Sequence, residues 1–258
     1  MSEKGFLVGV LGGLGPMSTV YFCELLTART AASCDADHLD MIISSRASTP
    51  DRTAFLLGRS TQSPSPVMAA EAARLEQAGA DLLAIPCNTA HCFYEDVQAA
   101  VSIPVLNIIW QNADFCRFLG LSRVGVLATE GTVASEAYKH ALSAVGIDYC
   151  VPDADGQAVV SRVIYDQIKC GKAPDLAAFT AVADALFARG CERVILGCTE
   201  LSLLKRHHLP DPRLIDSMEV LALAAIRACG KEPIGFDEDL MRYVPKNLPT
   251  KGICHAAQ

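Results

Sequence analysis

Several absences in this sequence exclude broad classes of protein. There is no basic block, and 22 Lys and Arg residues stand against 29 Asp and Glu, for a formal net charge of −7 and a pI near 5.4. Nucleic acid and anionic membrane surfaces are therefore poor partner candidates. No apolar run approaches the roughly 18 residues of a transmembrane helix. No C-x-x-C pair occurs, so we expect no structural zinc site and no other bound metal.

The cysteines do not form a recognisable disulfide framework. There are eleven, an odd number, scattered through 258 residues that are 51% hydrophobic, so the chain can build a core without disulfides. The apolar run Phe6–Leu11 follows Lys4, as a signal peptide would, but Glu3 precedes it, glycine interrupts it and no small-x-small cleavage site follows. We expect a cytoplasmic protein.

The stretch from Asp81 to His91, DLLAIPCNTAH, presents a thiol at the end of a predicted strand. The apolar run Leu82–Ile85 ends at Pro86, Cys87 follows, and small polar residues then open a predicted helix. In open α/β sheets this carboxyl edge is where ligands bind. For a single cysteine, a buried structural thiol is the more common situation.

The N-terminal apolar run predicts a strand, a glycine turn at Gly12–Gly15 and then a helix. This turn partly resembles the dinucleotide-binding fingerprint. It lacks the third glycine, contains Pro16, and no acidic residue ends the second predicted strand, His38–Ser44. NAD binding is therefore disfavoured, and we expect no cofactor.

A diverged repeat divides the chain into two similar halves. Val8-Gly-Val-Leu11 reappears as Val124-Gly-Val-Leu127, and a glycine lies seven residues after the first valine in both, at Gly15 and Gly131. The segment QAGADLLAIPCNT likewise aligns with ARGCERVILGCTE, which pairs Cys87 with Cys198. Three matches in the same order indicate a duplicated α/β unit.

The repeat predicts an α/β fold of two similar domains, each a parallel sheet flanked by helices, related by pseudo-twofold symmetry. We assign residues 1–108 with about 210–258 to the first domain, and 109–209 to the second. The strand ends of both domains would then face a shared cleft, with Cys87 and Cys198 on opposite sides of it. We place the active site in this interdomain cleft.

Two opposed thiols suit the inversion of a stereocentre. One group removes a proton from one face of a carbon atom while the other returns a proton to the opposite face. Each cysteine precedes a predicted helix, and a helix N-terminus can lower the pKa of a thiol. The N–H groups there can also hold a carboxylate or an enolate-like intermediate.

Five motifs in this order resemble the aspartate/glutamate racemase superfamily, most closely its cofactor-independent aspartate racemases. They are GGLGPMST, PDRT, PCNTAH, ATEGT and LGCTE. The resemblance extends to about Gly230, and the two cysteine motifs are its most specific part. It implies two α/β domains that enclose an acidic amino acid, racemisation by paired cysteines without pyridoxal phosphate, and a homodimer. Where aspartate racemases commonly have Met and Ala, this chain has Leu14 and Ser18.

The resemblance also implies roles for individual residues. Cys87 and Cys198 would be the two acid/base groups. Three residues, Asn88, Thr89 and Thr199, would lie beside the α-carboxylate and amino group of the substrate. Arg52 and Lys169 match cations that bind the side-chain carboxylate, and a guanidinium can clamp a carboxylate through two hydrogen bonds.

Three further residues have less defined roles. Thr132 is a candidate for the cleft lining and for substrate binding, although turn chemistry also accounts for it. His91 could assist Cys87 or be a local cap or packing residue, and Glu200 has the same ambiguity beside Cys198. We expect both to support the cysteines.

The leading hypothesis is a racemase of aspartate, with glutamate as a second substrate. Two alternatives remain open. One is isomerisation of a small diacid such as maleate, which also uses paired cysteines. The other is an acidic-ligand binder without catalysis, which would not need both thiols.

Overall fold

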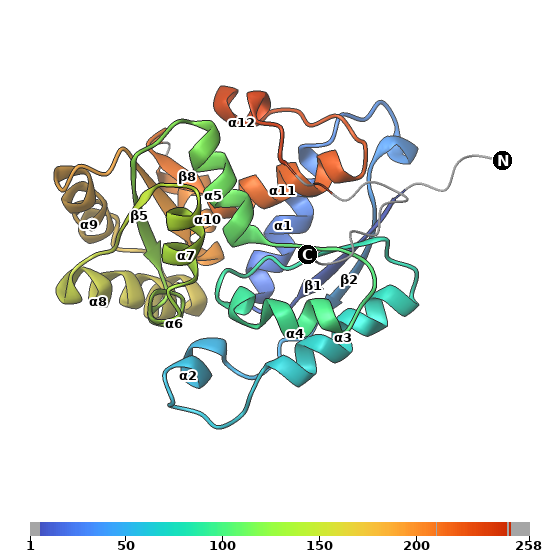
Figure 1. Cartoon of the computed structure of the whole chain (residues 1–258), viewed down its shortest axis with the longest axis horizontal. Helices are drawn as coiled ribbons and strands as arrows, with labels where there is room; N and C mark the ends of the chain where they lie inside the picture. Colours follow the sequence, from blue (N-terminus) through green and yellow to red (C-terminus); the bar gives the residue numbers. More distant parts are fainter. Residues whose placement is uncertain (1–5, 210, 247, 249–258) are drawn as a thin grey trace.

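The strands form two separate parallel sheets (Figure 1) in a computed structural model that describes residues 6–209, 211–246 and 248. Within these ranges each sheet has four strands, ordered β2-β1-β3-β4 in the first and β6-β5-β7-β8 in the second. The first sheet comprises β1 (Leu7–Gly12), β2 (Asp40–Ser45), β3 (Leu82–Ala84) and β4 (Val105–Leu106). The second comprises β5 (Arg123–Ala128), β6 (Asp148–Cys150), β7 (Arg193–Gly197) and β8 (Leu214–Asp216). The same strand order occurs twice, as the repeat predicts.

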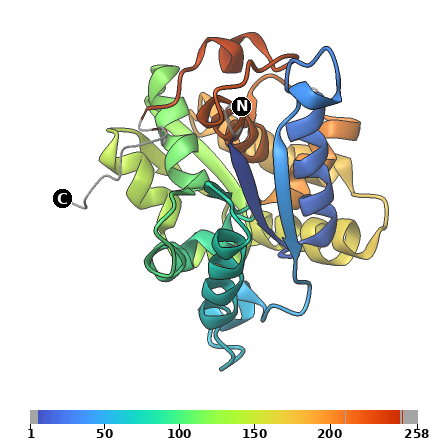
Figure 2. The same cartoon turned by 90° about the vertical axis from the view of Figure 1, so that its right-hand side faces the viewer.

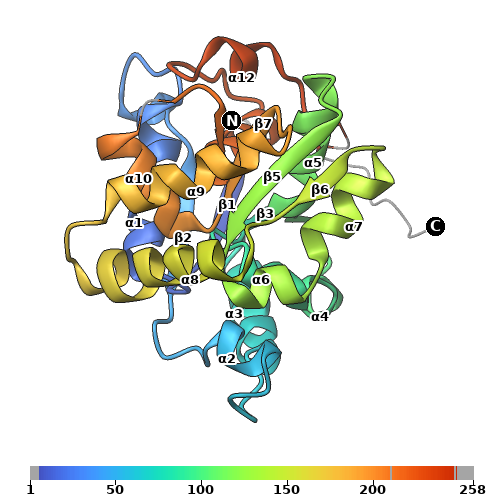
Figure 3. The same ribbon diagram turned by 90° about the vertical axis from the view of Figure 1, so that its left-hand side faces the viewer.

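Helices cover both faces of each sheet. Those of the first half are α1 (Pro16–Ala28), α2 (Arg52–Leu56), α3 (Ser65–Gln77), α4 (Tyr94–Ala99) and the 3₁₀ turns η1 (Asp35–Asp37) and η2 (Thr89–Phe93). Those of the second half are α6 (Glu130–Ala134), α7 (Ala137–Ala144), α8 (Ala154–Arg162), α9 (Leu176–Ala188), α10 (Thr199–His208), the π-helical η3 (Val163–Gln167) and the 3₁₀ turn η4 (Ile168–Cys170). Three more helices are α5 (Ile108–Phe118), α11 (Ser217–Ala228) and α12 (Glu238–Arg242). Figure 2 shows α1 and α3 on either side of β1 and β2, and Figure 3 shows α8, α9 and α10 over the second sheet.

The predicted domain boundary near residue 210 is wrong at one strand. β8 pairs with β7 in parallel, with Ile195 opposite Ile215, so the second sheet extends to Asp216. β8 is the counterpart of β4, since the two are the last strands of their sheets, and the sequences Pro104-Val-Leu and Pro212-Arg-Leu beside them are loosely similar. Residues 1–5, 210, 247 and 249–258 of the predicted division lie outside the described residues.

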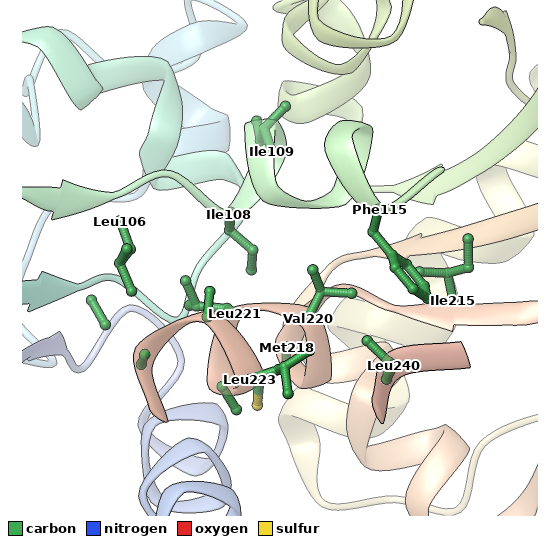
Figure 4. Close-up of a cluster of buried hydrophobic side chains, with 14 of the residues drawn as sticks. Leu106, Ile108, Ile109, Phe115, Ile215, Met218, Val220, Leu221, Leu223 and Leu240 are labelled. Atoms are coloured by element: carbon green, nitrogen blue, oxygen red, sulfur yellow. The ribbon is translucent and has the colours of Figure 1, made fainter. Parts of the chain in front are cut away.

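The two halves share one hydrophobic core. A single cluster of buried side chains takes in Val8 and Val10 from β1, Val124 and Val126 from β5, and much of the central helices α5 and α11. Figure 4 shows α5 and α11 meeting through side chains such as Ile108 and Leu221. Two smaller clusters cover the outer sheet faces, under α3 in the first half and under α8, α9 and α10 in the second. The halves are thus joined at their back, which leaves the strand ends to form the cleft.

The two central helices begin in the same way. Asn107 follows β4, and its side chain accepts hydrogen bonds from Ile109 N and Trp110 N at the start of α5. Asp216 ends β8 and accepts from Met218 N at the start of α11. Both side chains satisfy N–H groups that have no intrahelical partner. Each sheet therefore continues directly into a capped helix of the shared core.

The two matched glycines of the repeat, Gly15 and Gly131, lie in close contact with residues of the opposite half. A Cβ at Gly15 would lie 2.5 Å from Glu200 Oε1, and one at Gly131 would lie 2.9 Å from Thr53 Cα. Gly15 also has φ +142°, a conformation that favours glycine. Their recurrence in both halves thus follows from close contact across the cleft.

No helix in the described part of the chain is long and apolar enough to cross a membrane. The same residues bring no group of three or more His, Cys, Asp or Glu side chains into a metal-binding arrangement.

Candidate active site

Cys87 and Cys198 line the same cavity between the two halves. Cys87 follows β3, and Cys198 follows β7, which is the corresponding strand of the second sheet. Both side chains are buried, with 7% and 5% of their surface exposed. The topology therefore brings two thiols from opposite halves to one place.

The cavity is small. Its volume is about 10 Å³, room for about one water molecule. It is lined by Leu14, Asp51, Arg52, Thr53, Cys87, Asn88, Thr89, Thr129, Tyr165, Lys169, Cys198, Thr199 and Glu200. A ligand the size of an amino acid therefore fits only when the walls of the cavity move apart.

Glu200 connects one thiol to a cation. Cys198 Sγ donates to Glu200 Oε2 at 3.0 Å, and Lys169 Nζ lies 3.4 Å from Glu200 Oε1. Lys169 also lies over the Tyr165 ring, 5.1 Å from its centroid. The carboxylate is 5% exposed, so its contacts act where water screens them little. The expectation that Glu200 supports Cys198 thus agrees with a direct hydrogen bond.

These contacts shift the pKa values of Cys198 and Lys169. Burial, and next the negative charge of Glu200, raise the pKa of Cys198 well above its ordinary value, with Lys169 opposing them. The expectation that a helix N-terminus lowers the pKa of this thiol is therefore wrong here, although Cys198 does occupy the N-cap of α10. Burial lowers the pKa of Lys169, but the charge of Glu200 outweighs this and raises it. Both shifts favour the protonated form, which is a thiol at Cys198 and an ammonium group at Lys169.

Arg52 lies in the cavity wall with part of its guanidinium unused. The residue is 9% exposed, and its Nη atoms donate to the main-chain oxygens of Leu14, Thr49 and Pro50 at 2.8–3.3 Å. Its Nε is buried with no hydrogen-bond partner among the described residues. A buried donor without an acceptor is costly, and a carboxylate in the cavity could accept from it.

A cluster of hydroxyl groups joins the halves. Thr89 Oγ1 lies 3.0 Å from Thr129 Oγ1 and 2.8 Å from Thr132 Oγ1, and Thr53 donates to Thr129 at 3.3 Å. Tyr165 OH in turn donates to Thr53 at 2.9 Å. Thr89 lines the cavity as expected, whereas Thr132 lies behind it and contacts the other threonines. These hydroxyls hold the two halves closed.

Asn88 and Thr199 are both among the residues that line the cavity. The Asn88 side chain is committed to a buried network, since Tyr138 OH donates to its Oδ1 at 2.6 Å and its Nδ2 donates to Ser217 Oγ at 3.0 Å. Thr199 is the first residue of α10 and is 1% exposed. Asn88 therefore ties the halves together close to the thiols.

His91 supports Cys87 through the main chain. Its Nδ1 lies 2.8 Å from the Cys87 carbonyl oxygen, and its Nε2 lies 3.2 Å from both Ile108 N and the Leu106 carbonyl oxygen. Neutral His91 donates from Nδ1 to Cys87 O when its Nε2 accepts from Ile108 N. Burial lowers the pKa of His91 and so favours the same form. Of the two roles left open, the local structural one fits this geometry.

Two lining residues escaped the sequence analysis. Thr53 belongs to the motif that identified Arg52 but was not itself predicted to line the cleft. Tyr165 lies in the π-helical η3, four residues before Lys169. A π-helix is rare and often marks a functional site, but no simple sequence pattern announces it. The only sequence pattern that pointed to Tyr165 was its spacing of four residues from Lys169, which places the two side chains on one face of a helix.

The comparison with protein families identifies this architecture. The model for Asp/Glu/Hydantoin racemase matches residues 11–225. The broad specificity amino-acid racemase RacX of Bacillus subtilis (strain 168) is 30% identical over 233 residues, which cover 85% of this chain and 96% of that protein.

Solved structures agree with this result. Picrophilus torridus aspartate racemase superposes with a TM-score of 0.77 at 29% identity, covering 89% of this chain and 96% of that one. Glutamate racemase from Francisella tularensis subsp. tularensis SCHU S4, in complex with D-glutamate, has the same fold, with a TM-score of 0.59 at 19% identity over 88% of this chain and 81% of that one.

Proposed function

The chain belongs to the Asp/Glu/hydantoin racemase family, and on that premise we propose that it interconverts L- and D-aspartate, with glutamate as a second substrate. In this proposal Cys87 and Cys198 act as the two acid/base groups, and no cofactor takes part. The observation that carries the proposal is the position of two buried thiols, one from each half, in a single closed cavity.

The two thiols differ in their contacts. Cys198 Sγ donates to Glu200 Oε2, and burial and Glu200 raise its pKa, so in this proposal Cys198 is the acid in one direction of the reaction and Cys87 is the base. The Cα–H bond of the substrate breaks, its proton passes to Cys87 Sγ, and the electron pair remains on an enolate-like intermediate. Cys198 Sγ–H then protonates the opposite face, which inverts the centre. After this turnover Cys87 Sγ carries the substrate proton and Cys198 is the thiolate, which is the state that the reverse reaction requires. Glu200 Oε2, which accepts from Cys198 Sγ at 3.0 Å, holds this side chain in place.

The cations of the cavity support an acidic substrate. Arg52 offers its unpartnered Nε, and Lys169 lines the same cavity from the second half. Each can donate to the side-chain carboxylate of aspartate, which would close the two halves around it. Glutamate is longer by one methylene, a difference worth about 1–3 kcal/mol in a fitted pocket.

Proton exchange at Cα provides the test. The protein is incubated with L-aspartate in D₂O while NMR follows the Cα proton and polarimetry follows the optical activity. Racemisation requires loss of both signals. L-Glutamate and a panel of neutral and basic amino acids extend the test, since the RacX relative is named for broad specificity. Absence of exchange with every amino acid would refute the proposal.

Cysteine variants test the two-thiol assignment. Cys87→Ser and Cys198→Ser should each abolish full racemisation, because each removes one of the two groups. Cys34→Ser is the matched control, because Cys34 is exposed and lies outside the cavity. Wild-type turnover in either cavity variant would contradict the assignment.

A further inference from the structure

Ser18 has a buried hydroxyl group without a hydrogen-bond partner in the part of the chain that the structure describes. It lies in the first turn of α1 and is 1% exposed. Its Oγ has no hydrogen-bond partner among the described residues. Buried hydroxyls nearly always have a partner, and an exception calls for an explanation.

The hydroxyl lies next to the Glu200 carboxylate. A Cβ at Gly15 would lie 3.2 Å from Ser18 Oγ and 2.5 Å from Glu200 Oε1, so the two oxygens border the same point in space. Glu200 reaches this point from the second half. It faces the N-terminus of α1, which has no side-chain cap and no acidic residue in its first turn. The dipole of α1 favours a negative charge there.

Glu200 Oε1 has Lys169 as its cationic partner, at 3.4 Å. The Lys169 side chain is 30% exposed, lines the cavity and has a second aromatic contact with Tyr165. A substrate carboxylate would compete with Glu200 for this ammonium group. If Lys169 leaves, Oε1 becomes a buried carboxylate oxygen without its cation, which is unfavourable unless another donor replaces it.

We propose that Ser18 is that replacement donor: when a substrate carboxylate takes Lys169 from Glu200, Ser18 Oγ–H donates to Glu200 Oε1 and keeps Oε2 on the Cys198 thiol. Ser18 is then a positioning residue that acts through Glu200. This inference rests on the proposed function, because it requires a carboxylate in the cavity.

A double-mutant cycle on ligand binding tests the exchange. Succinate, a dicarboxylate that cannot be racemised, is titrated calorimetrically into the wild type, Ser18→Ala, Glu200→Gln and the double variant. Ser18→Ala should raise the Kd for succinate about tenfold, the size expected for one lost hydrogen bond to a charged group. In the Glu200→Gln background the same change should have little effect, because the charge that needs the hydroxyl is gone.

Stability measurements separate this role from a structural one. Ser18→Ala removes a buried hydroxyl that has no hydrogen-bond partner among the described residues. Without ligand, the thermal unfolding midpoint of this variant should therefore equal or exceed that of the wild type. Thr27→Ala is the matched control, since Thr27 is an exposed hydroxyl near the other end of the same helix, bonded to Cys23 O. It should leave the Kd unchanged.

Three results would overturn the inference: wild-type affinity in Ser18→Ala, an equal loss in both backgrounds, or no binding of succinate to the wild type. Racemisation of aspartate by the wild type is measured in parallel. If the wild type racemises aspartate and Ser18→Ala binds succinate with wild-type affinity, only the role of Ser18 is overturned. A wild type that racemises no amino acid overturns the proposed function and this inference together.

Discussion

Replacement of Glu200 by glutamine should make Cys198 a far more reactive thiol. In the empty protein the carboxylate accepts from Cys198 Sγ at 3.0 Å, and its negative charge opposes formation of the thiolate. Glutamine keeps the size and a hydrogen-bonding oxygen but removes the charge. The pKa of Cys198 should therefore fall.

The size of the effect follows from the distance. A unit charge 3.0 Å away opposes ionisation by about 5 kcal/mol at an effective dielectric constant of about 20. Lys169 neutralises part of that charge from the other carboxylate oxygen, 3.4 Å away. If about half of the effect survives, the thiolate fraction near neutral pH rises roughly 30- to 150-fold in Glu200→Gln.

Alkylation by iodoacetamide measures this fraction, because only the thiolate reacts. The rates at Cys198 and Cys87 are obtained separately from their peptides by mass spectrometry. Opening of the cavity limits access to both thiols equally, so Cys87 is an internal reference and its rate should change by less than about threefold.

Glu130→Gln provides a matched control. It removes a carboxylate from the interface of the halves, where Glu130 pairs with Arg59 at 2.9 Å, but outside the residues that line the cavity. Its effect should be the same on both thiols. If Cys198 in Glu200→Gln reacts no faster than in the wild type, the electrostatic role given to Glu200 is refuted.

Two further predictions concern the contacts around the site. Gly131→Ala places a methyl group 2.9 Å from Thr53 Cα, and overpacking of this kind typically costs about 1–3 kcal/mol. The kcat/KM for aspartate should therefore fall about tenfold or more, while the far-UV circular dichroism stays unchanged. Wild-type kinetics in this variant would contradict close contact of the halves. Burial lowers the pKa of His91 in the folded protein, so as the pH falls the unfolded chain takes up a proton on this histidine before the folded protein does. The contribution of neutral His91 to the free energy of unfolding is therefore complete above about pH 6.5 and declines by about 1.4 kcal/mol per pH unit below it. Urea unfolding at pH 7.0 and 5.5 should show this loss in the wild type and a smaller one in His91→Gln.

Much of the fold could be predicted because the chain contains it twice. Matching valine–glycine runs predicted β1 and β5, and matching cysteine segments predicted β3 and β7. The repeat did not reveal how the halves share their core. The repeat is also weak at the last strand of each sheet, and the predicted boundary near residue 210 therefore separated β8 from the second sheet.

The site was predictable where single residues carry the chemistry. The two cysteines and Arg52 stand in motifs, and the structure brings them into one cavity with Lys169. The properties that arise from the contact of the halves could not be predicted. The raised pKa of Cys198 depends on burial and on the charge of Glu200, and Tyr165 lies in the π-helical η3, which no simple sequence pattern announces.

The small size of the cavity affects the apparent affinity of this protein for its ligands. Only conformers with separated halves can accept an amino acid, so the apparent affinity equals the intrinsic affinity multiplied by the population of such conformers. If that population were about 1%, binding would be about 100-fold weaker than the contacts alone provide. Substitutions that weaken the hydroxyl contacts of Thr53 with Thr129 and Tyr165 would raise the population. They should thus tighten the apparent binding of a ligand and speed its release, and they should also expose Cys87 and Cys198 to more solvent.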